Sequence, residues 1–404
     1  SYSTYERTGD IYCLFYELGH DLLKPNGELC FITSNKWMRA GYGEKTRAFL
    51  TNSTNPLLLI DFAGVKVFEN ATVDTNILLF SKSSNSGDTL CAVAANQSRD
   101  VINNMSDFLK QTGCRCAFAE SGAWVVLSEI EQSIKRKIEA VGKPLRDWDV
   151  SINYGIKTGF NDAFIVTTQK RDEILASCRT EEEREKTAEV LRPILRGRDI
   201  KRYSYDWADL WLIWIPWHFP LHLDTTIQGA SEIAENEFKE QYPSMYGHLS
   251  QYKEQLSARN KAETGIRYEW YALQRWGAQY WEDFGKPKIV WAELARSGNA
   301  FVLDLNGHLV GNTGYILTVP DNDIKKLTFL LAFLNSRVVL YCLNLVSTRF
   351  DDNGWRWLRQ FVEMLLIPPF NDSELYNQLI EIAHEANSAN QNIASESING
   401  IVYE

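Results

Sequence analysis

The chain has 404 residues, 45% of them hydrophobic and 12% aromatic, and this composition excludes an intrinsically disordered protein. Its length predicts two or three domains. The formal net charge of −10 argues mildly against a nucleic-acid binder, but the charge is unevenly spread. Residues 371–404 contain six acidic residues and no Lys or Arg, which leaves −4 for the other 370 residues. A basic face on an acidic protein is therefore compatible with the sequence.

The sequence shows no sign of a metal centre, a secretory signal or a membrane span. Its seven cysteines form no C-x-x-C pair, Cys114 and Cys116 are too close for the usual zinc spacing, and the six histidines are isolated. No apolar run approaches the ~20 residues that a span needs, and the N-terminus lacks a basic-then-apolar pattern. We therefore expect reduced thiols in a cytoplasm, no metal and no membrane.

In the first part of the chain, strand and helix signals alternate. A helix is predicted from residue 9 or 10 to about 23, followed by the turn Lys-Pro-Asn-Gly and then by strands at 28–33, 57–62 and 75–81, with a helix at 43–50 between the first two strands. This alternation predicts an α/β sheet with parallel neighbours. Residues 81–89, rich in Ser, Asn and Gly, predict a domain boundary.

Further along, helices are expected at 97–111, 127–141, 242–259 and 324–345, the last one buried because it is apolar nearly all round. Strands are expected at 289–291, 301–303 and 314–319, and Leu375, Leu379 and Ile382 predict a helical tail. Four Trp (207, 211, 214 and 217) favour a core strand over a base-stacking surface. We divide the chain into residues 1–84, a helical connector at 85–145, a main domain at 146–370 and a tail at 371–404.

The most informative stretch runs from Ile152 to Tyr203. Gly155 and Gly159 punctuate a strand, a turn and a short apolar run at 163–166. Five basic residues (192, 196, 198, 201 and 202) then follow with one acid, Asp199. Such a cluster suits a surface that meets phosphates, although on charge alone a solvated loop explains it equally well.

Two segments of this stretch, Gly-Ile-Lys-Thr-Gly-Phe-Asn-Asp-Ala-Phe at 155–164 and Pro-Ile-Leu-Arg-Gly-Arg-Asp-Ile-Lys-Arg-Tyr at 193–203, resemble the TaqI-like C-terminal target-recognition domain. That domain occurs in N6-adenine DNA methyltransferases and in fused, type IIG-like restriction-modification enzymes. The resemblance implies an α+β domain that binds double-stranded DNA, in which Asn161 could read adenine and Arg or Lys guanine. The candidate DNA-binding residues are Lys157, Thr158, Asn161, Arg196, Arg198, Lys201 and Arg202, although Thr158 and Gly159 could equally shape a turn.

A second candidate DNA patch is the Gly-bearing loop in which Arg349, Arg356 and Arg359 surround two Trp residues. The interleaved cations and aromatics at 267–276 suit bases and internal packing equally well. The helix at 324–345, with the Leu-Ile-Pro at 366–368, also resembles a part of type I restriction specificity subunits.

The N-terminal part resembles the C-terminal half of an adenine methyltransferase catalytic domain, through Asp-Ile-Tyr at 10–12, Leu-Leu-Lys-Pro-Asn-Gly at 22–27 and Ile-Thr-Ser-Asn-Lys-Trp at 32–37. Residues 67–73 resemble the loop whose aromatic ring packs against the flipped adenine, which makes Phe68 the candidate catalytic residue. The expected fold class is therefore α/β, with the C-terminal half of a Rossmann-like methyltransferase sheet followed by an α+β target-recognition domain and a helical tail.

Neither the Asn-Pro-Pro-Tyr element of such enzymes nor their Gly-rich S-adenosylmethionine motif occurs in this sequence. We expect the C-terminal part of a longer bacterial enzyme, inactive alone and associated with the nucleoid when bound to DNA. S-adenosylmethionine is implied for the full-length enzyme, without cofactor-binding residues in this chain. The expected partners are DNA and the missing N-terminal half, on the same polypeptide or a separate one. Either that half covers an otherwise unpaired strand edge, or the first 80 residues are less ordered than the rest.

Two other classes of function stay open. Acidity and many aromatic residues suit a non-catalytic protein that binds carbohydrate or peptide, which predicts no salt-dependent affinity for DNA. An enzyme of unrelated chemistry, in a cleft between the halves, would bind a small cofactor on this chain alone. The sequence contains no G-x-S-x-G, Walker A or H-E-x-x-H motif.

Overall fold

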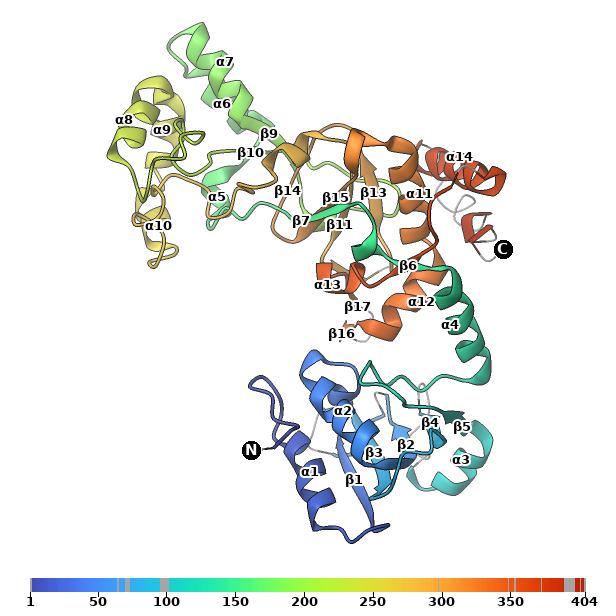
Figure 1. Cartoon of the computed structure of the whole chain (residues 1–404). Helices are drawn as coiled ribbons and strands as arrows, with labels where there is room; N and C mark the ends of the chain where they lie inside the picture. The colour runs from blue at the N-terminus through green and yellow to red at the C-terminus, as the bar shows by residue number, and fades with distance from the viewer. Residues whose placement is uncertain are drawn as a thin grey trace. The chain divides into compact units, whose positions relative to one another are not determined.

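The computed structural model describes residues 2–63, 65–69, 73–94, 102–296, 298–347, 349–351, 354–371, 373–388, 397–399 and 401–402. The chain forms two compact units (Figure 1), residues 1–142 with 344–348 and residues 143–343 with 349–404. The sheet of the first unit continues past residue 84, since β4 (Thr89–Val93) pairs with β2 (Asn55–Asp61). The predicted division into four segments stays a prediction.

In the first unit, the strands of the described residues form one five-stranded sheet. Its elements are α1 (Tyr12–Leu22), β1 (Glu28–Ser34), α2 (Glu44–Ser53), β2, β3 (Thr75–Ser81), β4, α3 (Met105–Thr112), β5 (Cys114–Cys116) and α4 (Glu129–Val141), and the strand order is β1-β3-β2-β4-β5. The prediction of parallel neighbours is wrong for the three predicted strands, since β1 with β3 and β2 with β3 are antiparallel; β2 does pair in parallel with β4, a strand that was not predicted. A loop, rather than a crossover helix, joins β2 to β3 in the described residues, so the chain can turn straight back.

Aromatic residues and a small polar network tie α1 to the sheet. The ring centre of Tyr16 lies 5.6 Å from those of Phe31 and Trp37. The Tyr16 hydroxyl is 2.7 Å from Thr33 Oγ1, and Asn76 Oδ1 accepts hydrogen bonds from Thr33 Oγ1 and Trp37 Nε1. These buried hydrogen bonds fix the outer strand β1 on β3, although they leave Asn76 Nδ2 without a partner among the described residues.

The described residues of the second unit form four sheets, and the helices alternate irregularly with the strands. The first half contains β6 (Lys143–Pro144), β7 (Ser151–Tyr154), α5 (Asn161–Phe164), β8 (Ile165–Thr167), α6 (Thr168–Ala176), α7 (Glu181–Val190), β9 (Leu191–Leu195), β10 (Leu210–Ile213), α8 (Glu232–Gln241), α9 (Pro243–Ser250) and α10 (Lys253–Ala258). The second half contains β11 (Lys288–Ala292), β12 (Leu294–Ala295), β13 (Phe301–Asp304), β14 (Leu309–Val310), β15 (Gly314–Thr318), α11 (Ile324–Leu334), α12 (Arg337–Val346), β16 (Arg349–Asp351), β17 (Gly354–Arg356), α13 (Arg359–Val362), β18 (Leu366–Ile367) and α14 (Glu374–Ser388).

Two four-stranded sheets, β14-β9-β10-β8 and β13-β11-β15-β7, share the main core of this unit. Only β14 and β9 pair in parallel within these two sheets; the other pairs are antiparallel. Strands β12, β17 and β16 form a third sheet, and β18 pairs with β6. A mixed α/β fold with several sheets is thus confirmed.

Several predicted elements are divided in the structure. The helix expected at 324–345 breaks at Asn335 because its side chain binds the backbone of Phe301 at both N and O, as a strand partner would. The helix expected at 242–259 is α9 followed by α10, and the apolar run at 163–166 ends α5 and begins β8. Trp214 lies in the core as predicted, and Trp207, Trp211 and Trp217 are partly buried.

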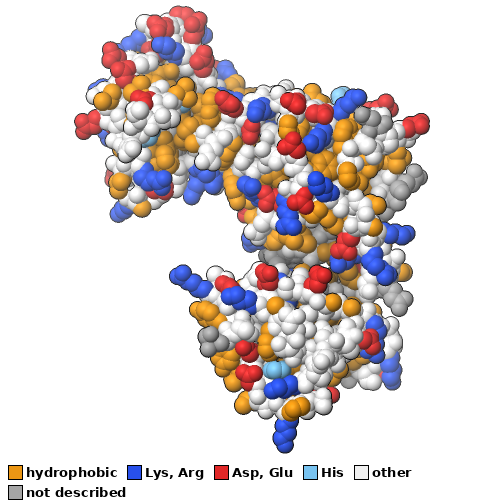
Figure 2. Space-filling model, in the orientation of Figure 1, with side chains coloured by type: hydrophobic (Ala, Val, Ile, Leu, Met, Phe, Trp, Pro, Cys, Tyr) orange, Lys and Arg blue, Asp and Glu red, His pale blue; other side chains and the backbone are white. Residues whose placement is uncertain are grey.

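No single helix among the described residues is long and apolar enough to cross a membrane; α11 and α12 pass that test of length and composition only as a pair bent by 67°. On the face that Figure 2 shows, acidic and basic side chains are interspersed, with acidic ones prominent at the end of the second unit that carries α6 and α7. Helix α7 by itself contributes five Glu residues to this end, at positions 181, 182, 183, 185 and 189. On this face, the basic residues do not form one continuous surface.

Candidate nucleic-acid interface

The two segments of the recognition motif meet in one hollow of about 310 Å³ in the second unit. We call it the recognition hollow, and its lining residues are Ile156, Thr158, Asn161, Ile165, Ile194, Arg196, Gly197, Arg198, Gly311, Asn312 and Thr313. Three short segments supply them: the β7–α5–β8 region, the end of β9 with the turn after it, and the β14–β15 turn. The β14–β15 turn was not predicted from the sequence as part of the site.

Backbone pairing brings these segments together. Gly155 N donates a hydrogen bond to Gly314 O (2.9 Å) and Ile156 N to Val310 O (2.7 Å), while β14 lies parallel to β9. A Cβ on Gly155 would lie 2.0 Å from Gly311 O, so only glycine allows the two backbones to approach this closely. The glycine in the motif thus has a specific structural reason.

The lining of the recognition hollow changes from apolar to polar toward the solvent. Ile156 and Ile194 are buried, with 2% and 1% of their surface exposed, whereas Asn161, Arg198 and Asn312 are exposed. The hollow therefore presents an aliphatic interior and a hydrogen-bonding entrance. Such a combination suits a ligand with a flat apolar face and a polar edge.

A partly buried arginine that was not predicted from the sequence holds one wall of the hollow. The Arg259 guanidinium donates hydrogen bonds to the carbonyl oxygens of Thr158, Trp270 and Ala272, and burial lowers the pKa of Arg259 to about 10. Thr158 Oγ1 in turn donates to Asn161 Oδ1 at 2.6 Å. Thr158 is itself buried, so the structure assigns it to the support of Asn161.

The five basic residues at 192–202 separate into two groups. Arg196 forms two hydrogen bonds with the carboxylate of Asp199 (2.7 and 2.9 Å), and Arg202 donates to Asn335 O. Arg192 donates to Gly307 O at 3.4 Å, and burial lowers the pKa of both Arg192 and Arg202. Arg198 and Lys201 are exposed. Only the last two present charge to solvent without a carboxylate partner among the described residues.

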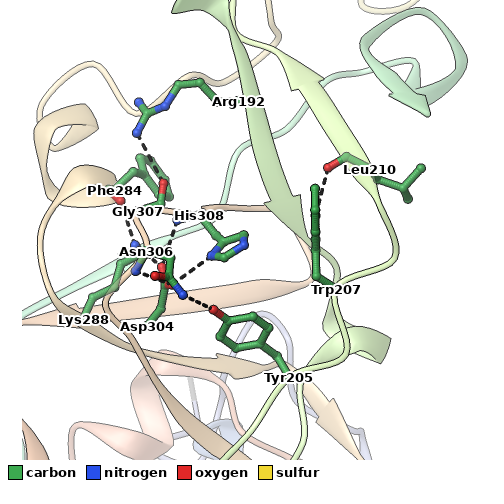
Figure 3. Close-up of polar contacts among 10 residues, drawn as sticks. All are labelled: Arg192, Tyr205, Trp207, Leu210, Phe284, Lys288, Asp304, Asn306, Gly307 and His308. Carbon is green, nitrogen blue, oxygen red and sulfur yellow. Dashed lines mark hydrogen bonds and ion pairs between the residues drawn. The ribbon is translucent and has the colours of Figure 1, made fainter. Parts of the chain in front are cut away.

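A buried charged cluster fixes the turn that leads into β14 (Figure 3). The Asp304 carboxylate accepts hydrogen bonds from Lys288 Nζ (2.6 Å) and from the backbone N of Asn306 and His308, and lies 2.9 Å from His308 Nδ1. Burial alone would raise the pKa of Asp304, but the hydrogen bond from His308 and the charge of Lys288 outweigh it and hold the pKa below its usual value. The cluster stabilises the β13–β14 connection, and with it the position of Gly311.

The remaining candidates lie outside the lining of the hollow. Lys157 is exposed, and its backbone exchanges two hydrogen bonds with that of Arg275. Arg275 lies over the ring of Tyr154, at 5.1 Å. The backbone of Arg349 belongs to β16, but its side chain lies outside the described residues, and Arg356 is a partly buried residue of β17. Whether these residues contact DNA stays a prediction.

Phe68 lies in the first unit, on the loop between β2 and β3, with 45% of its surface exposed. The base of this loop is fixed by Asp61 Oδ1, which accepts hydrogen bonds from Asn35 Nδ2 (2.8 Å) and Ala63 N (3.0 Å). Residues 70–72 of the predicted adenine-binding loop lie outside the described residues. The ring of Phe68 is therefore accessible to a flat ligand.

Two family models match parts of the chain that the sequence indicated, although the first motif segment, residues 155–164, lies outside the match. Residues 192–365 match the TaqI-like C-terminal specificity domain, and residues 1–68 match the Eco57I restriction-modification methylase. Both resemblances are confirmed: the chain is similar to a restriction-modification methylase over residues 1–68 and to a TaqI-like specificity domain over residues 192–365.

Among the relatives, the chain is 24% identical over 344 residues to the type II restriction enzyme and methyltransferase RM.Eco57I of Escherichia coli, covering 81% of this chain and 33% of that protein. It is 22% identical over 385 residues to the type II methyltransferase M.BstVI of Geobacillus stearothermophilus, covering 91% and 62%. The chain thus spans less than two thirds of these two relatives. Its fold resembles that of the type IIL restriction-modification enzyme MmeI, solved in complex with DNA, with a TM-score of 0.53 and 13% identity over 98% of this chain and 49% of MmeI.

Proposed function

We propose that this chain recognises a specific sequence in double-stranded DNA, as part of a restriction-modification enzyme that transfers a methyl group from S-adenosylmethionine to adenine N6. The observation that carries the proposal is the recognition hollow, in which both segments of the TaqI-like motif meet. Its exposed groups are those that read base edges and phosphates, namely two amides, a hydroxyl and a guanidinium.

The residues around the hollow have different roles in the proposed recognition of DNA. Lys157, Arg198 and Lys201 are exposed cations on the two motif segments, and we assign them to phosphates. Asn161 is held at its Oδ1 by Thr158, which leaves its amide nitrogen and a second lone pair to meet a purine edge. Arg196 and Arg202 act by keeping the segments in place.

In the first unit, we assign Phe68 to stacking against an adenine that has left the helix. Extrusion is required because the reacting amino group cannot be reached inside the duplex. The ring's 45% exposure supports this role. S-adenosylmethionine would supply the methyl group, but the glycines between β1 and α2, Gly41 and Gly43, follow a further 3-10 turn at Asn35–Met38 and do not form a turn directly after the strand. No residue of this chain is therefore assigned to the cofactor.

A partner methyltransferase half is supported by the outer edge of the first unit. Strand β1 pairs on one side only within the described residues. Beside it, α1 exposes a stripe of apolar side chains on one helical face, formed by Ile11, Phe15, Leu18 and Leu22. An unpaired strand with neighbouring exposed apolar surface suits a second sheet segment. We propose that the cofactor-binding half covers this edge.

Selection of duplexes from a random pool tests the proposal directly. The chain should enrich a short consensus, and its affinity should fall when the selection is repeated at higher salt. Salt-sensitive binding without a consensus would contradict sequence recognition by this chain. Failure to bind at either salt concentration would refute DNA binding and favour the carbohydrate- or peptide-binding alternative.

A further inference from the structure

We infer that the recognition hollow takes a nucleobase that has left the DNA stack, separately from the adenine assigned to Phe68. This inference rests on the proposed function, since it requires that the second unit binds DNA. The hollow lies in the second unit and Phe68 in the first, and the inference assigns one base to each.

The interior of the hollow selects the kind of group that enters. Ile156 and Ile194 are buried and Ile165 is partly buried, so the inner lining is aliphatic. A phosphate inserted against these side chains would lose its hydration without gaining a charged partner, which is costly. A nucleobase presents a flat face that aliphatic side chains can cover.

The entrance of the hollow supplies partners for the polar edge and the phosphate of a nucleotide. Asn161 and Asn312 contribute amides and Thr313 a hydroxyl, and all three are exposed. The guanidinium of Arg198 has no hydrogen-bond or ion-pair partner in the described part of the chain, and it lines the same entrance. If the edge of a base binds the amides of Asn161 and Asn312, the phosphate of the same nucleotide would therefore lie within reach of the Arg198 guanidinium.

The size of the hollow fits one base. Its volume of about 310 Å³ lies at the lower end of the roughly 300–1,000 Å³ of small-molecule sites. A stacked duplex offers only base edges and backbone to a recessed hollow, so a base must rotate out to reach the isoleucines. Asn161 is already fixed by Thr158, which prepares the entrance for a single ligand orientation.

Gly311 provides a variant that narrows the hollow without disturbing the fold. A Cβ added there would meet Leu195 O at 3.8 Å and Ile194 Cδ1 at 3.9 Å, which are ordinary contacts. Gly311→Ala therefore places a methyl group in the lining and should leave the unfolding temperature nearly unchanged. Asn312→Ala removes one of the edge-binding amides.

The experiment uses the full chain and the duplex that it selects. Single 2-aminopurine substitutions at each purine, and pyrrolocytosine at each cytosine, report a base that leaves the stack by a rise in fluorescence. We expect the fluorescence to rise at one position of the duplex. Gly311→Ala and Asn312→Ala should abolish this rise, and Phe68→Ala should leave it unchanged. A mismatch at that position should tighten binding by about tenfold, because the cost of unpairing has already been met.

The possible results separate this inference from the proposed function. Consensus binding with no brightening, or with brightening that responds only to Phe68→Ala, would overturn the extruded base in the hollow and leave DNA recognition intact. An unchanged signal in Gly311→Ala and Asn312→Ala, with the fold preserved, would overturn it as well. Absence of duplex binding by the unaltered chain would overturn both.

Discussion

Replacing Arg198 with Gln should weaken the salt dependence of DNA binding without weakening the fold. Three exposed cations lie on the motif segments, Lys157, Arg198 and Lys201, and each phosphate contact adds about −0.9 to the slope of log K against log salt concentration. Three contacts give a slope of about −2.7, and the loss of one gives about −1.8. Between 50 and 200 mM salt, affinity should thus fall about 40-fold for the unaltered chain and about 12-fold for the variant.

Fluorescence anisotropy with the selected duplex, at five or so salt concentrations, measures both slopes. Arg196→Gln is the matched control, because that guanidinium is bound to the carboxylate of Asp199 rather than presented to solvent. It should leave the slope nearly unchanged and instead lower stability by about 1–3 kcal/mol, since the buried carboxylate loses its partner. If Arg198→Gln keeps the original slope while Arg196→Gln reduces it, the assignment of exposed and structural arginines is wrong.

Four further outcomes follow from the contacts. Gly155→Ala should lower the unfolding temperature of the second unit markedly, with a cost of about 3 kcal/mol or more, because its Cβ would lie 2.0 Å from Gly311 O; a normal melting curve would contradict this. Lys288→Met should cost about 3–5 kcal/mol in urea unfolding, since it leaves the Asp304 carboxylate buried without its cation. Because the pKa of Asp304 is lowered in the fold, its contribution is present above about pH 4 and is lost as pH falls below that, which acid titration of the folded state should show. Phe68→Ala should change stability by less than about 0.5 kcal/mol and leave duplex affinity intact, yet abolish fluorescence of a 2-aminopurine at the target adenine.

The two motif segments could be recognised in the sequence because each is a continuous run of residues. The third segment that lines the hollow, the β14–β15 turn, could not be recognised in this way. Gly155 and Gly197 mark close approaches, yet nothing in the sequence says that the facing backbone is that of Gly311 and Thr313, more than a hundred residues away. Long-range β pairing is decided by the packing of the whole domain, and Arg259 reaches the site through folding in the same way. A partly buried arginine bound to four backbone carbonyl groups has no signature in charge patterning.

The prediction that neighbouring strands of the first unit are parallel was wrong for a related reason. Apolar strand runs were located well, and β3 was predicted at 75–81 as observed, but periodicity says nothing about which strands pair. The loop that carries Phe68 returns the chain directly, so β3 inserts antiparallel between β1 and β2. The single helix predicted at 324–345 was likewise broken by Asn335, whose amide binds a strand. In each case tertiary hydrogen bonding overrode a local pattern.

The division between structural and exposed cations also bears on how such a domain could change its target. Arg202 and Arg259 hold backbone carbonyl groups, and Arg196 neutralises a buried carboxylate, so their loss would disturb the walls of the hollow. Asn161 and Asn312 stand at the entrance, where replacing a side chain costs little stability. Substitution of the entrance residues, with the residues of the wall kept, should therefore change the DNA sequence that is recognised. Such variants should select a different consensus and have the same unfolding temperature.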